Sequence, residues 1–350
     1  NESHMYIEDR SFILKDDVSI LEAIASLNNS GHLICIIVDN ANVLRGTITD
    51  GDVRRGLLAG KATSDLATEI MITDPIFSYV DFTLEQHKSL SIQHQVKQIP
   101  IVNKKNCIQS LYIREGIAEP TRKDNPILIM AGGFGKRMLP LTTDSPKPML
   151  EISGKPILEH ILCNARSQGF YSFFISVHYL ADQIMDYFGD GSKWNLEIEY
   201  LQEEHPLGTA GCLSLFKSQP SLPFIVTNGD IYTDINFSSI LNFHTSNNAA
   251  ATMAVKRQLL QNPFGVVQTR GVEIVAIEEK PINPSYVNSG IYVMDPSNLN
   301  LLERNSFCDM PNFFMLLKDN SKKIVAFPIH ESWADVGRPL DLYKVNESGN

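Results

Sequence analysis

The chain has 350 residues, of which 43% are hydrophobic and 20% charged, and these values are typical of a globular protein with about two domains. Its formal net charge of −10 argues against a general nucleic-acid binder, although it leaves room for a local cationic pocket. No apolar run approaches the ~20 residues that span a bilayer, so we expect no membrane segment.

The start of the chain and its cysteines bear on where the protein works. We expect no signal peptide, and Asn1–Met5 looks like a vector remnant with Met5 as the native start. The five cysteines are odd in number and scattered without a C-x-x-C pair. This pattern indicates reduced thiols and no zinc site, so we expect a cytoplasmic protein.

The first 118 residues contain a diverged internal repeat. A helix pattern is followed by apolar strands at 33–38 and 43–49. The same order recurs 64 residues later, where a helix pattern begins after Thr83 and strands follow at 98–102 and 107–113. Two β-α-β-β units of this length predict a small α+β domain.

This tandem arrangement over residues 6–118 resembles a pair of cystathionine-β-synthase (CBS) domains, which often bind adenine nucleotides such as AMP or ATP. Thr49-x-x-Asp52 resembles the ribose-binding motif of that family. The resemblance implies that Asp52 accepts hydrogen bonds from ribose hydroxyls and that Thr49 contacts the phosphate–sugar region. In the second copy Ile113 and Gly116 replace these residues, so the pair keeps at most one such site. The alternative is a purely structural module, because Thr-x-x-Asp at a helix start is also an ordinary cap.

A linker and an α/β domain are predicted after this pair. Residues 119–126 are polar and carry a proline at each end, a composition that suits a linker. Over residues 127–350 apolar strands at 127–130, 173–177 and 224–227 alternate with helix patterns. This alternation predicts an α/β fold with a mainly parallel sheet, whose ligands bind beyond the carboxyl ends of the strands.

The first of these strands runs into the glycine-rich turn Ala131-Gly-Gly-Phe-Gly-Lys-Arg137, and Lys147 follows between two prolines. Glycines let the backbone close on a phosphate chain, and nearby cations neutralise that chain. The dinucleotide fingerprint fails because Met138 stands at its third glycine. The Walker loop fails at Met130 and Arg137. The turn therefore predicts nucleoside triphosphate chemistry of another kind.

Residues 131–149 resemble the signature of the sugar-1-phosphate nucleotidyltransferases, and later stretches match that family in order. These stretches are Gln202, Leu207–Gly211, Asn228–Asp230, Phe264–Val267, Glu279–Pro281, Asn288–Gly290 and Trp333–Gly337. The resemblance covers about residues 125 to 345 and implies a Rossmann-like, GT-A-like sheet. One departure is Lys136, where relatives often carry Thr or Ser; it adds charge and removes no needed group.

The resemblance implies attack by a sugar-1-phosphate oxygen on the α-phosphorus of a nucleoside triphosphate, with release of pyrophosphate. The nucleophile is already an anion, so positioning and cations should supply most of the rate. Arg137 would hold the β- and γ-phosphates, Lys147 would sit near the α-phosphate, and Asp230 and Asp335 would bind Mg²⁺. Each assignment has a simpler alternative. Asp230 would then be an ordinary turn residue, and Lys147 would be a solvated surface cation.

The resemblance also assigns two groups of binding residues. The nucleotide group is Ala131, Gly132, Gly133, Gly135, Gln202, Gly208 and Thr209. The sugar-phosphate group is Gly265, Glu279, Lys280, Asn288 and Trp333. Glu203 would accept two donors from guanine and hints at GTP, although Glu203 and Glu204 are more often a solvated pair.

The whole arrangement resembles the guanylyltransferases of bacterial legionaminic acid synthesis, which use glucosamine-1-phosphate. This implies GTP and glucosamine-1-phosphate as substrates and GDP-glucosamine as product, with Glu278 or Glu279 facing the amino group. UTP, dTTP or CTP remain open, as does a mannose- or heptose-type sugar.

The second hypothesis is a catalytically silent subunit that only binds nucleotide sugars. We expect a homo-oligomer, since CBS pairs and this transferase family often self-associate.

Overall fold

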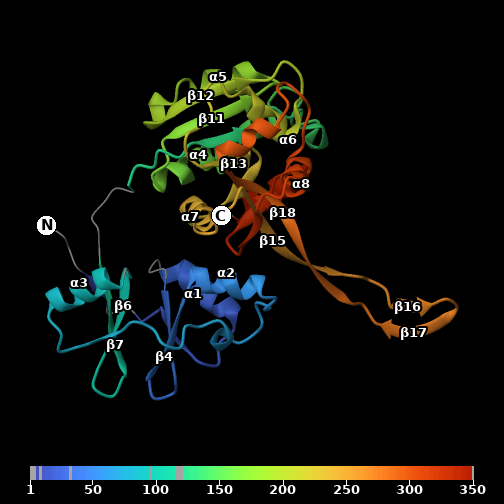
Figure 1. The fold of residues 1–350 in the computed structure, drawn as a ribbon. Coiled ribbons are helices and arrows are strands. Elements are labelled where there is room, and N and C mark those ends of the chain that lie inside the picture. Colours follow the sequence, from blue (N-terminus) through green and yellow to red (C-terminus); the bar gives the residue numbers. More distant parts are fainter. Residues whose placement is uncertain (1–4, 8–9, 31–33, 95, 115–120, 349–350) are drawn as a thin grey trace. The chain divides into compact units, whose positions relative to one another are not determined.

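The computed structural model describes the whole chain except residues 1–4, 8–9, 31–33, 95, 115–120 and 349–350. The chain divides into two compact units, Asn1–Ala118 (unit 1) and Glu119–Asn350 (unit 2) (Figure 1). Some sequence predictions fall outside the described residues: the vector remnant before Met5, the strand start at Leu33, the repeat position Gly116 and the first two residues of the linker.

Unit 1 contains two sheets whose elements repeat along the chain. One sheet has the order β2 (Ile13–Lys15), β3 (Ile34–Val38), β4 (Leu44–Thr49). The other has the order β1 (Met5–Ile7), β7 (Ile108–Ile113), β6 (Gln98–Val102), β5 (Ser78–Tyr79). The helices are α1 (Ile20–Ser30), α2 (Asp50–Leu58), η1 (Ala67–Glu69) and α3 (Leu84–Gln93). The first residues of β3 and β6, of β4 and β7, and of α1 and α3 are each 64 positions apart, as the predicted repeat requires.

The strand β3 shows why its sequence is apolar without interruption. Cys35 and Ile37 pack into a core with α1 and α2, whereas Ile34, Ile36 and Val38 pack into a second core with residues of β6 and β7. Successive side chains of a strand point to opposite faces, so burial of both faces removes any polar alternation. β3 therefore lies between two cores of unit 1.

Unit 2 is built on a seven-stranded sheet in the order β12-β11-β8-β13-β18-β15-β19. Its strands are β8 (Ile127–Met130), β11 (Ser172–Val177), β12 (Glu197–Gln202), β13 (Phe224–Asn228), β15 (Ala251–Gln261), β18 (Ile282–Met294) and β19 (Ile324–Ile329). β8, β11, β12 and β13 are parallel neighbours, whereas β18 is antiparallel to both β13 and β15. The prediction of a mainly parallel sheet is confirmed, and the carboxyl ends of β8 and β13 are adjacent.

Helices cover both faces of this sheet. They are α4 (Ile157–Ser167), α5 (Ala181–Phe188) and α7 (Phe237–Ser246) on one core and α8 (Met310–Asp319) on the other. In β8, Ile127 and Ile129 face the first core and Leu128 faces the second. A strand buried on both faces is expected to be apolar throughout, which explains the apolar run before the glycine loop.

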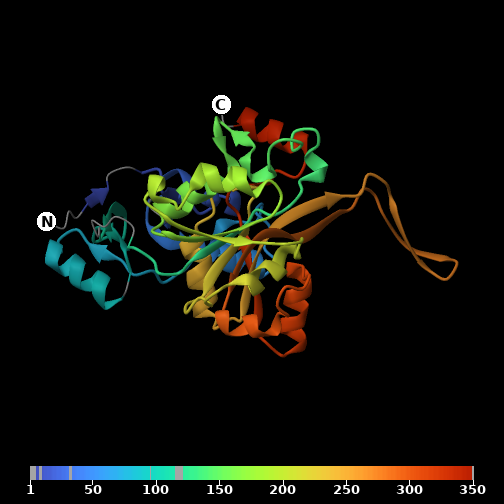
Figure 2. The same cartoon turned by 90° about the horizontal axis from the view of Figure 1, so that it is seen from above.

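The remaining elements of unit 2 are short. They are β9 (Glu151–Ile152), β10 (Lys155–Pro156), β14 (Ile231–Thr233), β20 (Trp333–Asp335), α6 (Gly208–Gly211), α9 (Pro339–Ser348), and the 3-10 helices η2 (Lys136–Met138), η3 (Lys147–Met149), η4 (Ser192–Trp194), η5 (Cys212–Leu215) and η6 (Pro296–Leu301). β16 (Val266–Arg270) and β17 (Glu273–Glu278) form a hairpin at the end of the long β15–β18 ribbon. In both views this hairpin projects away from the sheet of unit 2 (Figures 1 and 2).

A buried histidine in α7 is expected to make the stability of unit 2 depend on pH. The Nδ1 of His244 lies 2.9 Å from the Oγ1 of Thr252, and burial lowers the pKa of His244 below its usual value. Between this lowered pKa and ~6.5 the unfolded state binds more protons than the folded state, so the free energy of unfolding falls as the pH falls through this window. We expect His244→Gln to flatten that slope in urea titrations between about pH 5 and 7. The exposed His205→Gln is the control and should keep the wild-type slope; equal slopes for all three proteins would contradict the prediction.

Candidate active site

The glycine loop after β8 is held in a fixed shape by its neighbours. The backbone N–H of Ala131 donates to the Ser176 carbonyl of β11 at 2.8 Å. Gly135 has a left-handed φ of +61°, and a Cβ at this position would lie 3.0 Å from the Thr142 Cγ2 and 3.3 Å from the Lys147 Cβ. The Thr142 hydroxyl also donates to the Gly135 carbonyl at 2.9 Å. A side chain is therefore disfavoured at Gly135, and the close packing brings Lys147 against the loop.

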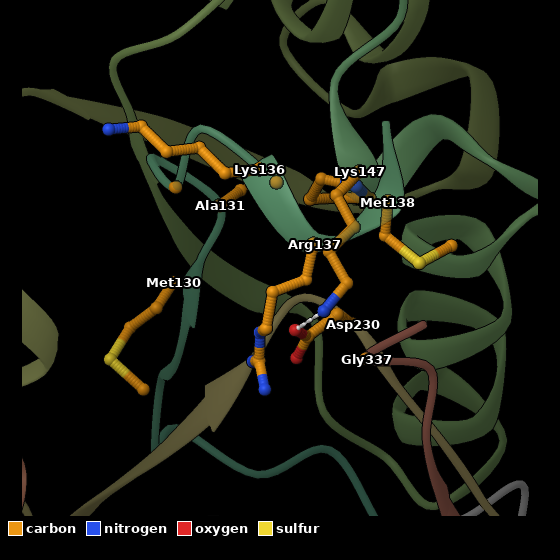
Figure 3. A pocket seen from close by; sticks show the side chains of 11 residues that line it. Met130, Ala131, Lys136, Arg137, Met138, Lys147, Asp230 and Gly337 are labelled. Carbon is orange, nitrogen blue, oxygen red and sulfur yellow. Dashed lines mark hydrogen bonds and ion pairs between the residues drawn. The ribbon is translucent and has the colours of Figure 1, made fainter. Parts of the chain in front are cut away.

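Lys147 is a buried cation at the base of this loop. It begins η3 directly after Pro146, and only 7% of its surface is exposed. Its Nζ forms an ion pair with the Asp230 carboxylate, and the Asp335 Oδ1 lies 4.0 Å away (Figure 3). Lysine is rarely buried unless it is paired, and here Asp230 and Asp335 supply the opposite charges.

The two aspartates come from distant parts of the sequence and meet through a short antiparallel pair. In β14 and β20, Ile231 lies opposite Asp335, and the N–H of Val336 donates to the Asp230 carbonyl at 3.1 Å. Burial raises the pKa of Asp335 above its usual value, and the Asp230 carboxylate raises it further, while Lys147 and Arg137 oppose the rise. The two carboxylates are thus close enough to repel each other.

One cavity of about 250 Å³ collects the predicted catalytic residues. It is lined by Met130, Ala131, Gly133, Gly135, Lys136, Arg137, Met138, Lys147, Pro148, Asp230 and Gly337. Arg137 and Lys147 extend toward Asp230, whereas the Lys136 side chain points away and lies over the Phe134 ring (Figure 3). The cavity lies beyond the carboxyl ends of β8 and β13, as the sequence predicts for a ligand site in a parallel sheet.

The aspartates fit a divalent cation. The Oδ1 of Asp230 is buried and has no hydrogen-bond partner within the described part of the chain. The neighbouring Asp335 carboxylate has a raised pKa partly because Asp230 repels it. A cation with oxygen ligands would satisfy the orphaned oxygen and remove the repulsion. Asp230 and Asp335 are therefore the residues that would hold such an ion.

Three residues of the predicted nucleotide group, Ala131, Gly133 and Gly135, line the cavity, and the others lie outside its lining in the described structure. The Thr209 Oγ1 accepts from the Met310 N–H at 2.7 Å, at the start of α8. Gly208 has a φ of +75°, and a Cβ there would lie 2.7 Å from the Cys308 carbonyl. Both residues pack α6 against the segment before α8. Neither of them is among the described residues that line the cavity. Gln202 is exposed at the carboxyl end of β12 and also lies outside that lining, as does Gly132.

The Glu203 carboxylate is bonded on both of its oxygens and packs against the glycine loop. Its Oε1 accepts from the Ser176 hydroxyl and its Oε2 from the Leu207 N–H at 2.9 Å. A Cβ on Gly132 would lie 3.0 Å from Oε1, so the carboxylate is wedged between the glycine loop and the turn that begins at Leu207. Both oxygens are engaged inside the protein, so a contact of Glu203 with guanine would require an exchange of these bonds. No local signal distinguishes it from its neighbour Glu204, which is exposed.

We expect Glu203→Ala to lower the free energy of unfolding of unit 2 by about 1–3 kcal/mol, because the Leu207 N–H would lose its buried partner. Glu204→Ala changes the same side chain one residue later at an exposed position, so its effect should stay within about 0.5 kcal/mol. Urea unfolding of both variants checks the difference. Equal effects at the two positions would contradict a bracing role.

The predicted sugar-phosphate group is split by the structure. Gly265, Glu279 and Lys280 lie at the base of the β16–β17 hairpin, and none of them is among the described residues that line the cavity. Asn288 lies in β18, Trp333 lies in β20 with Asp335, and both side chains bond to the protein. The Asn288 Nδ2 donates to the Tyr292 hydroxyl at 2.8 Å, and the Trp333 Nε1 donates to the Ser289 carbonyl at 2.9 Å. The five residues therefore lie on different elements of unit 2, and their binding of a sugar phosphate stays a prediction.

Unit 1 contains a cavity of its own. It measures about 370 Å³ and is lined by Ile34, Thr47, Thr49, Ile76, Val96, Lys97, Gln98 and Pro100. Asp52 is buried, and its Oδ2 accepts from both the N–H and the hydroxyl of Thr49, at 2.8 and 2.7 Å. Its Oδ1 pairs with Arg55. Thr49 thus borders a cavity as predicted for a ligand residue, whereas Asp52 makes the helix-cap contacts of the alternative interpretation.

Three comparisons place unit 2 among known proteins. The mannose-1-phosphate guanylyltransferase of Mycobacterium tuberculosis is 33% identical over 223 residues, which are 62% of this chain and 62% of that protein. The mannose-1-phosphate guanyltransferase of Aspergillus oryzae is 32% identical over 225 residues, or 61% of each chain. The crystal structure of HddC from Yersinia pseudotuberculosis is 26% identical, with a TM-score of 0.50, and the match covers 65% of this chain and 100% of that one. The chain spans about three fifths of the length of the curated relatives that it matches.

The family follows from the match over the catalytic unit. Residues 127–349 match the family model described as nucleotidyl transferase, which is more than half of the chain. The match begins at the first residue of β8 and includes the glycine loop, Lys147, Asp230 and Asp335. The chain belongs to the nucleotidyl transferase family.

Proposed function

We propose that this protein transfers a nucleotidyl group from a nucleoside triphosphate to a sugar-1-phosphate and releases pyrophosphate. The observation that carries the proposal is the convergence of Arg137, Lys147 and Asp230 on one cavity beyond the carboxyl ends of β8 and β13. A triphosphate and a sugar phosphate are both polyanions, and a cavity that pairs two cations with carboxylates suits their joint binding.

We assign each of these residues a role that its position supports. Arg137 is exposed at the cavity wall, and its planar guanidinium suits the β- and γ-phosphates that become the leaving group. Lys147 is buried at the base, where a fixed charge stabilises the charge that develops at the α-phosphate more strongly than it would in water. Asp230 and Asp335 would hold Mg²⁺, which supplies electrophilic stabilisation of the phosphates when bound.

We propose GTP and glucosamine-1-phosphate as the specific substrates. The product would be GDP-glucosamine, used in the synthesis of legionaminic acid or a related surface glycan. The names of the mannose-1-phosphate guanylyltransferases that this chain resembles support a guanine nucleotide. They favour mannose-1-phosphate as the alternative sugar. For an amino sugar, Glu278 or Glu279 would supply the carboxylate that pairs with the ammonium.

A substrate matrix tests this proposal. GTP, UTP, dTTP, CTP and ATP are each combined with glucosamine-, mannose- and glucose-1-phosphate in the presence of Mg²⁺, and pyrophosphate release is measured. The expected result is the highest kcat/KM for GTP with glucosamine-1-phosphate. Turnover with another pair would support the proposed reaction class and refute the proposed substrates. Nucleotide binding without turnover for any pair would favour a silent, nucleotide-sugar-sensing subunit.

We also propose that unit 1 is a CBS pair that binds AMP or ATP and regulates unit 2. The 64-residue spacing of its elements and the cavity bordered by Thr49 support this role. The bonds from Asp52 to Thr49 and Arg55 mean that ribose binding would have to replace at least one of these contacts.

We expect Asp52→Ala to abolish adenine nucleotide binding to the intact protein and to spare basal turnover, as measured by calorimetric titration with AMP and ATP. The matched control is Gln86→Ala, because Gln86 Oε1 accepts from the Thr83 N–H in the equivalent cap of α3. Both variants lose a cap contact worth about 1 kcal/mol. If Asp52→Ala destabilises the protein as Gln86→Ala does but keeps its nucleotide affinity, Asp52 is only a cap.

We further propose a cytoplasmic location and self-association. The five cysteines are free thiols, which is consistent with a reducing compartment. Within the described part of the chain, no helix is long and apolar enough to cross a membrane. Fractionation of cells that express the protein tests the location.

A further inference from the structure

The strand β18 bulges away from its neighbour β15. Asn288 and Tyr292 each have a partner in β15, but only Ala254 lies between these two partners, so residues 289–291 extend from the ladder and form the β18 bulge. The Ser289 hydroxyl donates to the Ala254 carbonyl at 2.8 Å, and Ser289 is buried. Backbone groups that leave a ladder need other partners, and bulges next to active sites commonly re-aim parts of the chain.

The backbone of this bulge packs on the turn that carries Asp230. Gly290 has a left-handed φ of +73°, and a Cβ at this position would lie 2.6 Å from the Asn228 Nδ2 and 2.7 Å from the Ile231 Cδ1. Asn228 and Ile231 stand on either side of Gly229 and Asp230 in the chain. Glycine is therefore required at this position, and its backbone lies against both ends of the turn.

The same bulge is bonded to the strand that carries Asp335. The Trp333 Nε1 donates to the Ser289 carbonyl at 2.9 Å. Trp333 is the first residue of β20 and Asp335 is its last, and β20 pairs with β14, which begins directly after Asp230. The β18 bulge therefore contacts both of the segments that hold the two aspartates.

Asn288 fixes the shape of the bulge from one end. Its Oδ1 accepts from the Gly290 N–H at 2.9 Å, and its Nδ2 donates to the Tyr292 hydroxyl at 2.8 Å. The segments that the bulge contacts are weak by comparison, because β14 and β20 have three residues each and a short two-stranded pair is marginally stable. Burial and the Asp230 carboxylate also raise the pKa of Asp335, so the two carboxylates repel each other. The pair of strands needs support from outside to keep both aspartates in place.

We propose that the β18 bulge and Trp333 brace β14 against β20 and so hold Asp230 and Asp335 at the spacing that a divalent cation requires. The inference rests on the proposed function, in which these two aspartates bind Mg²⁺. Trp333, Asn288 and Gly290 are then positioning residues, because they act on the cation through the backbone that carries its ligands. Removal of a partner that supports metal ligands typically lowers metal affinity by about 10–100-fold.

Binding of Mn²⁺ alone to the intact protein tests the brace. Trp333→Phe keeps an aromatic ring and removes the N–H bond to the Ser289 carbonyl, so the dissociation constant for Mn²⁺, measured by electron paramagnetic resonance, should rise about tenfold or more. The matched control is Trp194→Phe, because Trp194 is the other tryptophan of the chain and packs on Phe188. This control should keep the wild-type affinity. Since no sugar phosphate is present, a role of Trp333 in sugar binding alone predicts no change.

A second variant perturbs the brace by adding a side chain. Gly290→Ala places a methyl group against Asn228 and Ile231, so it should weaken Mn²⁺ binding at least as much as Trp333→Phe does. The matched control is Gly271→Ala, because its φ of +63° is also left-handed but a Cβ there meets no described atom within 4 Å. Both alanine variants carry the same backbone strain, and only the first displaces the turn of the aspartate. Circular dichroism shows whether each variant is folded.

The outcomes separate this inference from the proposed function. A folded Trp333→Phe protein with the wild-type affinity for Mn²⁺ would refute the brace, even if the wild type turns over normally. A wild-type protein that binds no Mn²⁺ would also refute it, together with the cation role of the aspartates. Weaker Mn²⁺ binding by Trp333→Phe but not by Trp194→Phe would support the brace. If the wild type then released no pyrophosphate with any substrate pair, the proposed function would fail and the brace would stand.

Discussion

Lys147→Met is expected to lower kcat for pyrophosphate release by about 10²–10³-fold. The ammonium is buried at the base of the cavity and ion-paired with Asp230, where its charge is only weakly screened by water. Methionine keeps most of the length of the side chain and removes the charge, so the loss reports electrostatic stabilisation of the transition state. KM for the triphosphate should rise less than kcat falls, because the interaction strengthens as charge develops at the α-phosphate.

The matched control for this variant is Lys155→Met. Lys155 is an exposed lysine of the same unit that pairs with Glu159 and does not line the cavity. Its substitution should change kcat less than about twofold, because exposed ion pairs contribute little. Steady-state kinetics and circular dichroism on both variants distinguish lost catalysis from lost folding. A fully active and folded Lys147→Met protein would remove Lys147 from the catalytic machinery.

The sequence predicts the parts of the site that follow directly from strands. Arg137 and Asp230 come just after apolar strands, and parallel neighbours end at the same edge of a sheet, so their meeting in one cavity is foreseeable. Asp335 could not be placed in this way. Its position depends on the pairing of two three-residue strands, β14 and β20, and such short strands carry no usable periodicity. Only the resemblance to a family pointed to it.

The sequence does not predict positions that depend on tertiary contacts. Glu203 and Glu204 are identical neighbours, and only the register of β12 decides which one is buried against the Ser176 hydroxyl. The long β15–β18 ribbon is a similar case. The sequence does not say how far this ribbon extends past the sheet, so the position of Glu279 and Lys280 at the base of the hairpin that it carries could not be foreseen.

Asp230→Asn is expected to lower the free energy of unfolding of unit 2 by about 3 kcal/mol, near the lower limit for breaking a buried ion pair. The variant leaves the Lys147 ammonium buried with a neutral partner, and the Asp335 carboxylate at 4.0 Å compensates only in part. The double variant Asp230→Asn/Lys147→Met should recover much of the loss, because it removes both charges. Urea unfolding of the two single variants and the double variant gives the coupling energy as a double-mutant cycle.

Asp335→Asn provides the contrast, because the two adjacent aspartates should have opposite effects on stability. The pKa of Asp335 is raised by burial and by Asp230, so its ionised form disfavours folding at neutral pH. Asp335→Asn should therefore unfold at the same or a higher urea concentration than the wild type at pH 7, and at pH 4 the gain should shrink as the native carboxyl takes up its proton. If the two aspartates hold Mg²⁺ as proposed, both asparagine variants should nevertheless lose Mg²⁺-dependent turnover, since each removes one of the two carboxylates. If Asp335→Asn were as unstable as Asp230→Asn, the repulsion between the two carboxylates would be absent, and with it the main physical reason to place a cation between them.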